Sequence, residues 1–150
     1  MTRTFEILGA NILIVDDQEA NILMLARMLR GAGYTSIQST QDPREVCELH
    51  RRNHYALILL DLKMPGMDGF EVMKGLQEIE TDGHLPVLVI TAEPGHKLRA
   101  LRAGAGDFVS KPLDLAEVLM RVHNLVELRL LHLETSRLAA ELVEKQRVSA

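Results

Sequence analysis

The sequence has few of the features that mark secreted, membrane-spanning or nucleic-acid-binding proteins. One cysteine in 150 residues, Cys47, leaves no disulfide to form within the chain. No run approaches the roughly 18 apolar residues of a membrane span, and residues 1–8 lack the cationic start and apolar run of a signal peptide. Lysine and arginine number 17 against 21 aspartates and glutamates, so no basic field attracts a phosphate backbone. We expect a cytoplasmic protein that binds neither membranes nor nucleic acid.

The sequence also lacks internal repeats, low-complexity tracts and linkers rich in proline, glycine and serine. With 47% hydrophobic residues, the chain is long enough for one domain with a buried core. Its character changes only after about Asn124, where helix-favouring sequence continues without glycine or proline. We expect a domain over residues 1–126 and a helical extension over residues 127–150.

Short apolar runs at residues 12–15, 56–60 and 87–90 predict strands of a parallel sheet, because such strands are buried on both faces. Weaker strands are expected at residues 35–39 and 107–109.

Helical patterns separate these strands. The first helix has apolar residues at i, i+3, i+4 and i+7: Ile22, Leu25, Ala26 and Leu29. Three aspartates predict helix starts: Asp42, Asp68 and Asp114. A short helix is expected at residues 96–105, and the last helix has an apolar stripe: Leu115, Val118, Leu119, Val122 and Val126. The alternation of strands and helices predicts a doubly wound α/β fold.

Polar residues end or follow four of the five expected strands. Asp16 and Asp17 follow the first, Asp61 the third, Thr91 the fourth and Lys111 the fifth. Ligands of such folds bind beyond the carboxyl ends of the strands, and neighbouring strands lie about 4.8 Å apart. We therefore expect these side chains to meet in one site.

Clustered carboxylates repel one another, and a hard cation with oxygen ligands relieves the repulsion, most commonly Mg²⁺ inside cells. A nucleophilic carboxylate beside a cation, an amine and a hydroxyl predicts phosphoryl transfer to an aspartate. Singly, each residue has a plainer interpretation: Asp16 and Asp17 or Thr91 as helix caps, Asp61 as a loop carboxylate before a turn at residues 64–66, and Lys111 as a surface charge. Their joint occurrence at successive strand ends favours the site.

Five blocks carry a family resemblance: ILIVDD (12–17), LLDLKMPGMDGF (59–70), VITA (89–92), AGA (103–105) and DFVSKP (107–112). In this order they resemble the signature blocks of response-regulator receiver domains of two-component systems, over roughly residues 10–125. The resemblance implies a five-stranded parallel sheet in the order 2-1-3-4-5. Gly106 departs from the pattern, because many receivers have a polar residue there.

The resemblance also implies roles for individual residues. Asp61 would be the phosphoacceptor, and Asp16, Asp17 and Asp61 would bind Mg²⁺ with the backbone carbonyl of Lys63. Thr91 would be the switch hydroxyl, and Lys111 the phosphate-binding lysine before a cis proline. Phe108 would be the aromatic switch residue, or alternatively an ordinary core phenylalanine. Lys63 and Glu93 occupy positions that influence dephosphorylation in this family.

By the same resemblance, the phosphoryl donor would be a sensor histidine kinase or a histidine phosphotransfer protein. The signal would travel as a shift of the fourth helix, fifth strand and fifth helix. The chain would then be a signalling module with no external substrate. One alternative is a Mg²⁺-dependent phosphohydrolase with an aspartyl-phosphate intermediate, but such enzymes carry an acid/base Asp where this chain has Lys63. A receiver-like scaffold that is not phosphorylated would lack the acceptor or the lysine, and both are present.

Two further patterns concern surfaces. His50 and His54, four residues apart, are expected on a solvated helix face rather than in a metal site, because no third ligand is evident. Beyond Asn124, four leucines approximate a heptad stripe around Thr135: Leu128, Leu131, Leu138 and Leu142. We expect them to pair two copies of the chain in a short coiled coil, although the same segment resembles connectors that join receivers to enzymatic output modules.

Overall fold

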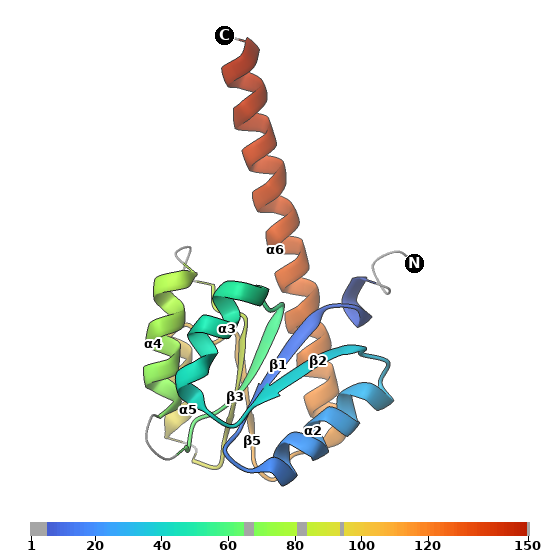
Figure 1. Cartoon of the computed structure of the whole chain (residues 1–150), viewed down its shortest axis with the longest axis vertical. Helices are drawn as coiled ribbons and strands as arrows, with labels where there is room; N and C mark the ends of the chain where they lie inside the picture. Colours follow the sequence, from blue (N-terminus) through green and yellow to red (C-terminus); the bar gives the residue numbers. More distant parts are fainter. Residues whose placement is uncertain (1–5, 65–67, 81–83, 94, 150) are drawn as a thin grey trace.

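The computed structural model describes residues 6–64, 68–80, 84–93 and 95–149, so Pro65 and Gly66 of the expected turn lie outside it. Five parallel strands form one sheet in the predicted order β2-β1-β3-β4-β5 (Figure 1). The strands are β1 (Asn11–Val15), β2 (Ser36–Thr40), β3 (Leu57–Asp61), β4 (Val87–Thr91) and β5 (Asp107–Ser110). Each bound lies within one residue of its prediction, because the apolar runs that mark the strands are fully buried in β3 and β4.

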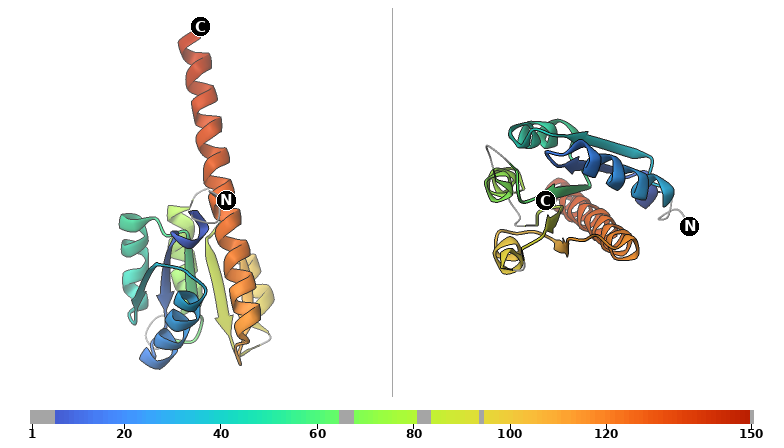
Figure 2. Two further views of the ribbon diagram at one scale, coloured as in Figure 1. Left: turned by 90° about the vertical axis from the view of Figure 1, so that its right-hand side faces the viewer. Right: turned by 90° about the horizontal axis from the view of Figure 1, so that it is seen from below.

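Helices cover both faces of this sheet (Figure 2). They are α2 (Glu19–Gly31), α3 (Val46–Asn53) after a 3-10 turn (Pro43–Glu45), α4 (Gly69–Ile79), α5 (His96–Arg102) and α6 (Leu115–Ser149). Alternate residues of one strand, such as Ile12 and Leu13, enter different cores: Ile12 packs with α2 and α6, and Leu13 with α3, α4 and α5. In the described part of the chain, no helix is long and apolar enough to cross a membrane.

The predicted helix starts are confirmed. The side chains of Asp42, Asp68 and Asp114 accept hydrogen bonds from the backbone N–H groups of Arg44, Glu71 and Glu117. The prediction of a helix over residues 96–105 was wrong at its end, since α5 stops at Arg102. Gly104 adopts φ +99°, a left-handed conformation that glycine tolerates and a helix does not.

The long last helix is continuous, as expected, but its packing differs from the predicted stripe. Val118, Val122 and Val126 are buried, whereas Leu115, at the first residue of α6, is 50% exposed. At the other end the packing continues past Val126, because Leu130 also contacts the core. The helix then leaves the domain at the sheet edge opposite the carboxyl ends of the strands and projects beyond it (Figure 1).

The packing of α4 on β3 yields a stability prediction. A Cβ at Gly69 would lie 2.8 Å from Leu62 Cα, and this contact with backbone cannot be relieved by a side-chain rotation. We expect Gly69→Ala to lower the free energy of unfolding by about 1–3 kcal/mol. Gly31→Ala is the matched control, since its Cβ would meet nothing within 4 Å, and it should stabilise by about 0.5–1 kcal/mol. Urea unfolding measures both, and equal stabilities would contradict the steric argument.

Candidate functional site

Three carboxylates meet at the carboxyl ends of β1 and β3. One oxygen from each of Asp16, Asp17 and Asp61 lies within 4.8 Å of the others. Asp16 and Asp61 are buried, and Asp17 is half-buried. The parallel pairing of β1 with β3 brings these side chains together, because it aligns Val15 with Leu60 and therefore the residues that follow.

Asp16 is held by its own loop. Its Oδ1 accepts hydrogen bonds from the backbone N–H of Gln18 at 2.9 Å and from Asn21 Nδ2 at 3.4 Å. Burial nevertheless raises the pKa of Asp16 above its ordinary value, and the nearby charge of Asp61 raises it further. The hydrogen bond from Gln18 and the charge of Lys111 offset part of this rise. A bound cation would favour the ionised form of Asp16.

Each carboxylate oxygen of Asp61 has a different hydrogen-bond partner. Oδ1 accepts the backbone N–H of Lys63 at 3.1 Å, and Oδ2 lies 3.2 Å from Lys111 Nζ. Lys111 follows the edge strand β5 and precedes Pro112 through a cis peptide bond, as the family resemblance implied. The ammonium group of Lys111 therefore places a positive charge beside the Asp61 carboxylate, at the carboxyl end of the central strand β3.

Thr91 ends β4, the strand beside Asp61, and its side chain is buried. Its hydroxyl accepts the backbone N–H of Glu93 at 3.0 Å. Phe108 is half-buried against the α3–α5 core, with Lys97 Nζ 4.9 Å from its ring centroid. The Phe108 ring is therefore only partly enclosed by the core.

An ion-pair chain that the sequence did not predict lies beside the acidic cluster. Lys63 Nζ contacts Glu93 Oε1 at 2.6 Å, and Glu93 Oε2 contacts His96 Nε2 at 3.2 Å. The pair with Glu93 raises the pKa of Lys63, and the same pair lowers the pKa of Glu93. The family resemblance marks Lys63 and Glu93 individually, but no sequence spacing links two residues that lie 30 positions apart.

The prediction that His50 lies on a solvated face was wrong. His50 is fully buried, while His54 is exposed and ends α3 in a left-handed conformation at φ 47°. Glu80 and the backbone N–H of Tyr55 hydrogen-bond the two ring nitrogens of His50. These partners satisfy the hydrogen-bonding capacity of the buried ring. The spacing of residues along the helix does not predict them, because Glu80 and Tyr55 lie outside it.

Comparisons with known proteins agree with this geometry. Residues 12–123 match the family described as the response regulator receiver domain. Response regulator PleD of Caulobacter vibrioides is 38% identical over 125 residues, covering 82% of this chain but only 27% of PleD. The polar-differentiation response regulator DivK of Brucella ovis is 33% identical over 107 residues, covering 70% of this chain and 86% of DivK.

A solved structure shows a similar fold. The receiver domain of sensor histidine kinase PA1611 from Pseudomonas aeruginosa, with magnesium coordinated in its active-site cleft, matches with a TM-score of 0.70 at 28% identity. The match covers 79% of this chain and 98% of that one. Sequence, strand order and the acidic cluster agree, and the chain belongs to the receiver-domain family of two-component response regulators.

Proposed function

We propose that the chain is a phosphorylatable switch whose acceptor is Asp61. The observation that carries the proposal is the contact of Lys111 Nζ with Asp61 Oδ2 at 3.2 Å, beside two further carboxylates. An oxygen of Asp61 would bond to phosphorus as the P–N bond of a phosphohistidine breaks. The donor would be a sensor histidine kinase or a histidine phosphotransfer protein. Lys111 would balance the charge on the phosphoryl oxygens.

The residues present fit a magnesium site. Asp16, Asp17 and Asp61 offer carboxylate oxygens, the donors that Mg²⁺ prefers, and we propose the backbone carbonyl of Lys63 as a further ligand. The raised pKa of Asp16 reflects burial and the repulsion that a cation would relieve. When bound, Mg²⁺ supplies charge neutralisation for the phosphoryl oxygens. The magnesium in the PA1611 receiver domain supports the choice of ion.

Thr91 and Phe108 form the proposed switch. The Thr91 hydroxyl accepts the N–H of Glu93 at 3.0 Å and donates to Glu93 O at 3.4 Å, and a phosphoryl oxygen on Asp61 would offer the hydroxyl a competing acceptor. Movement of Thr91 toward Asp61 would vacate space beside Phe108, which is half-buried and able to turn inward. The face formed by α5, β5 and α6 would carry the change.

A phosphohydrolase fits the geometry less well. Its acid/base carboxylate would stand where this chain has Lys63, whose amine is paired with Glu93 at 2.6 Å. The pair raises the pKa of Lys63, so the amine stays protonated at neutral pH and cannot act as a base. We therefore propose a signalling module that catalyses only its own phosphorylation and dephosphorylation.

We further propose that residues 1–126 form the receiver and residues 127–150 an extension that pairs two copies of the chain. Contacts of Leu130 with the core place the first turn of the extension against the receiver. The four stripe leucines beyond Asn124 are exposed in one chain: Leu128, Leu131, Leu138 and Leu142. Exposed apolar stripes of this kind favour a partner helix.

Beryllofluoride, a mimic of the acyl phosphate, tests the switch. With Mg²⁺ it should shift the amide resonances of Lys63 and Thr91 and the ring resonances of Phe108. Thr91→Ala should still bind it, with Lys63 shifting as in the wild type, but the response of Phe108 should disappear.

Ser110→Ala is the matched control, because Ser110 is the β5 partner of Thr91 in register and its replacement removes a hydroxyl while Thr91 and Phe108 stay unchanged. This variant should respond as the wild type does. Absence of any shift at Lys63 in the wild type would refute the acceptor site. A response of Phe108 that survives Thr91→Ala would refute the switch alone.

A further inference from the structure

A buried ion cluster joins the two helix layers at the amino ends of the strands, the end of the sheet opposite Asp61. Arg129 Nη2 of α6 donates to Glu80 Oε1 at 2.7 Å, and His50 Nε2 of α3 contacts the same oxygen at 2.8 Å. The side chains are 8% exposed for Arg129, 13% for Glu80 and 0% for His50. Arg129 thus reaches past the end of the sheet from the face of α6 to the face of α3 and α4.

The charges in this cluster are fixed by its hydrogen bonds. The backbone N–H of Tyr55 donates to His50 Nδ1 at 3.1 Å, so the ring proton sits on Nε2 and is donated to Glu80. Burial lowers the pKa of His50 and keeps the ring neutral near pH 7. The negative charge of Glu80 is therefore matched by Arg129 within this cluster. Among the described residues, Arg129 Nε has no hydrogen-bond partner, whereas Nη2 donates to Glu80.

Glu80 is also the last link of a short rigid path from Asp61. Gly69 is the first residue of α4, and its N–H donates to the carbonyl oxygen of Leu62 at 3.1 Å. Leu62 is the residue that follows Asp61. α4 has 11 residues and spans about 16 Å at 1.5 Å per residue. Glu80 caps its far end, with its N–H bonded to Leu76 O at 2.8 Å. The helix α4 is therefore bonded at its first residue to the residue after Asp61, and Glu80 at its other end is bonded to Arg129.

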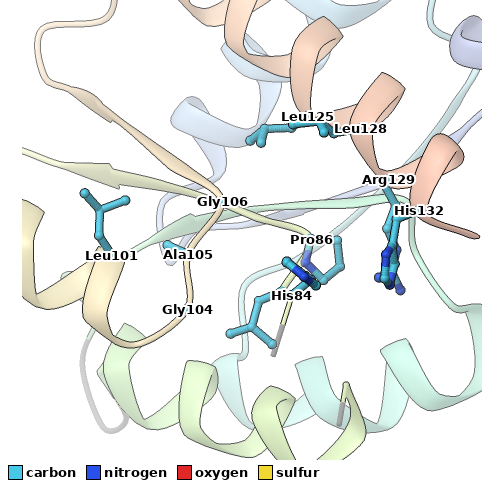
Figure 3. A pocket seen from close by; sticks show the side chains of 11 residues that line it. His84, Pro86, Leu101, Gly104, Ala105, Gly106, Leu125, Leu128, Arg129 and His132 are labelled. Carbon is cyan, nitrogen blue, oxygen red and sulfur yellow. The ribbon is translucent and has the colours of Figure 1, made fainter. Parts of the chain in front are cut away.

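Open space lies beside residues 125–132 of α6, the part of the helix that leaves the domain and is here called the root of α6. A pocket of about 500 Å³ lies between α6 and the turn that carries Gly104, Ala105 and Gly106. Figure 3 shows Arg129 and His132 pointing from α6 toward the segment with His84 and Pro86, across this space. The ring centroids of His132 and His84 lie 5.1 Å apart on this side of α6, but the rest of the space is open, so fewer packed side chains oppose a change in the position of the helix.

We propose that Glu80 and Arg129 link α4 to the root of α6, so that phosphorylation of Asp61 alters the projecting helix through α4 as well as through α5 and β5. The inference rests on the proposed phosphorylation. Glu80 and Arg129 are positioning residues: they do not touch the phosphoryl group, and they transmit a displacement of α4 because a buried ion pair tolerates little separation.

Hydrogen exchange of the full chain tests this link. With Mg²⁺, beryllofluoride should change the amide exchange rates of residues 127–133 by about fivefold or more, the lower end of typical allosteric coupling. In Arg129→Met, the change at residues 127–133 should be clearly smaller than in the wild type, because only the route through α5 and β5 remains, while Thr91 and Phe108 respond as in the wild type. Glu80→Gln retains the side-chain shape without the charge and should give the same reduction. It provides a second variant should Arg129→Met fold poorly.

Arg137→Met is the matched control, because Arg137 forms an exposed ion pair with Glu141 on the same helix, at 2.9 Å. Its response at residues 127–133 should equal that of the wild type. An unchanged response in both Arg129→Met and Glu80→Gln would overturn the link and leave the acceptor proposal intact, as would a wild type that responds at Thr91 but not in α6. If beryllofluoride changes nothing anywhere, the acceptor proposal fails and the link fails with it.

Discussion

Asp61→Asn should abolish phosphorylation. Incubated with Mg²⁺ and acetyl phosphate, the wild-type chain should gain one phosphoryl group, measured by intact mass, and the variant should gain none. The amide has no anionic oxygen to attack phosphorus, yet it keeps the size of the carboxylate and can still accept the N–H of Lys63, 3.1 Å away in the wild type. The loss therefore reports on chemistry rather than on folding.

Asp68→Asn provides the matched control. Asp68 belongs to the same segment and caps α4 by accepting the N–H of Glu71 at 2.9 Å, a role that asparagine fills about equally well. This variant should be labelled to the wild-type extent. Undiminished labelling of Asp61→Asn would place the acceptor elsewhere, with Asp16 and Asp17 the next carboxylates to replace.

The fold followed from local sequence because each element carried its own signal. Strands buried on both faces appear as plain apolar runs, and β3 and β4 are buried throughout. Helix starts were marked by Asp42, Asp68 and Asp114, whose caps need only the next few residues. The end of α5 was missed because a glycine inside a helical pattern stops the helix only when its φ becomes positive, as at Gly104.

The core of the site was also accessible from sequence, since parallel strands bring their carboxyl ends to one edge. The placement of Asp16, Asp17 and Asp61 together needs only that rule and the strand order. The pair of Lys63 with Glu93 was not accessible, because two exposed side chains from different loops leave no periodic trace.

The buried cluster at the root of α6 was missed for a related reason. His50 and Arg129 each look like polar residues on an amphipathic helix, which are normally solvated. Their burial depends on Glu80, which lies 30 residues from His50 and 49 from Arg129. Only the packed fold brings the three together.

The projecting helix should make the full chain a dimer. Leu128, Leu131, Leu138 and Leu142 are exposed and follow the a and d spacing of a coiled coil, with Thr135 at the position between the two pairs. Burying each leucine would contribute about 1.5–3 kcal/mol, against about 4–15 kcal/mol for association. The short stripe and Thr135 favour a dimer of moderate affinity, and light scattering at several concentrations measures it.

Leu138→Lys with Leu142→Lys should weaken this dimer about a hundredfold or more, because the dimer would lose four buried leucine side chains, two from each copy, and would place like charges in its seam. Leu133→Lys with Val143→Lys is the matched control. These residues are also exposed on α6, but they lie off the a and d positions, so pairing should persist. Equal weakening by both pairs would contradict the assigned seam.

Deleting residues 135–150 should leave a folded monomer that is still phosphorylated. The cut spares Leu130, which packs on the core, and Arg129, which holds Glu80, whereas a cut at residue 128 would remove both contacts. The acceptor site lies at the far edge of the sheet, so its labelling by acetyl phosphate should match that of the full chain. A full-length chain that stays monomeric at tens of micromolar would refute the coiled coil. The exposed leucines would then be better explained as the docking stripe of an output module, because an apolar face of this length is costly to leave in water.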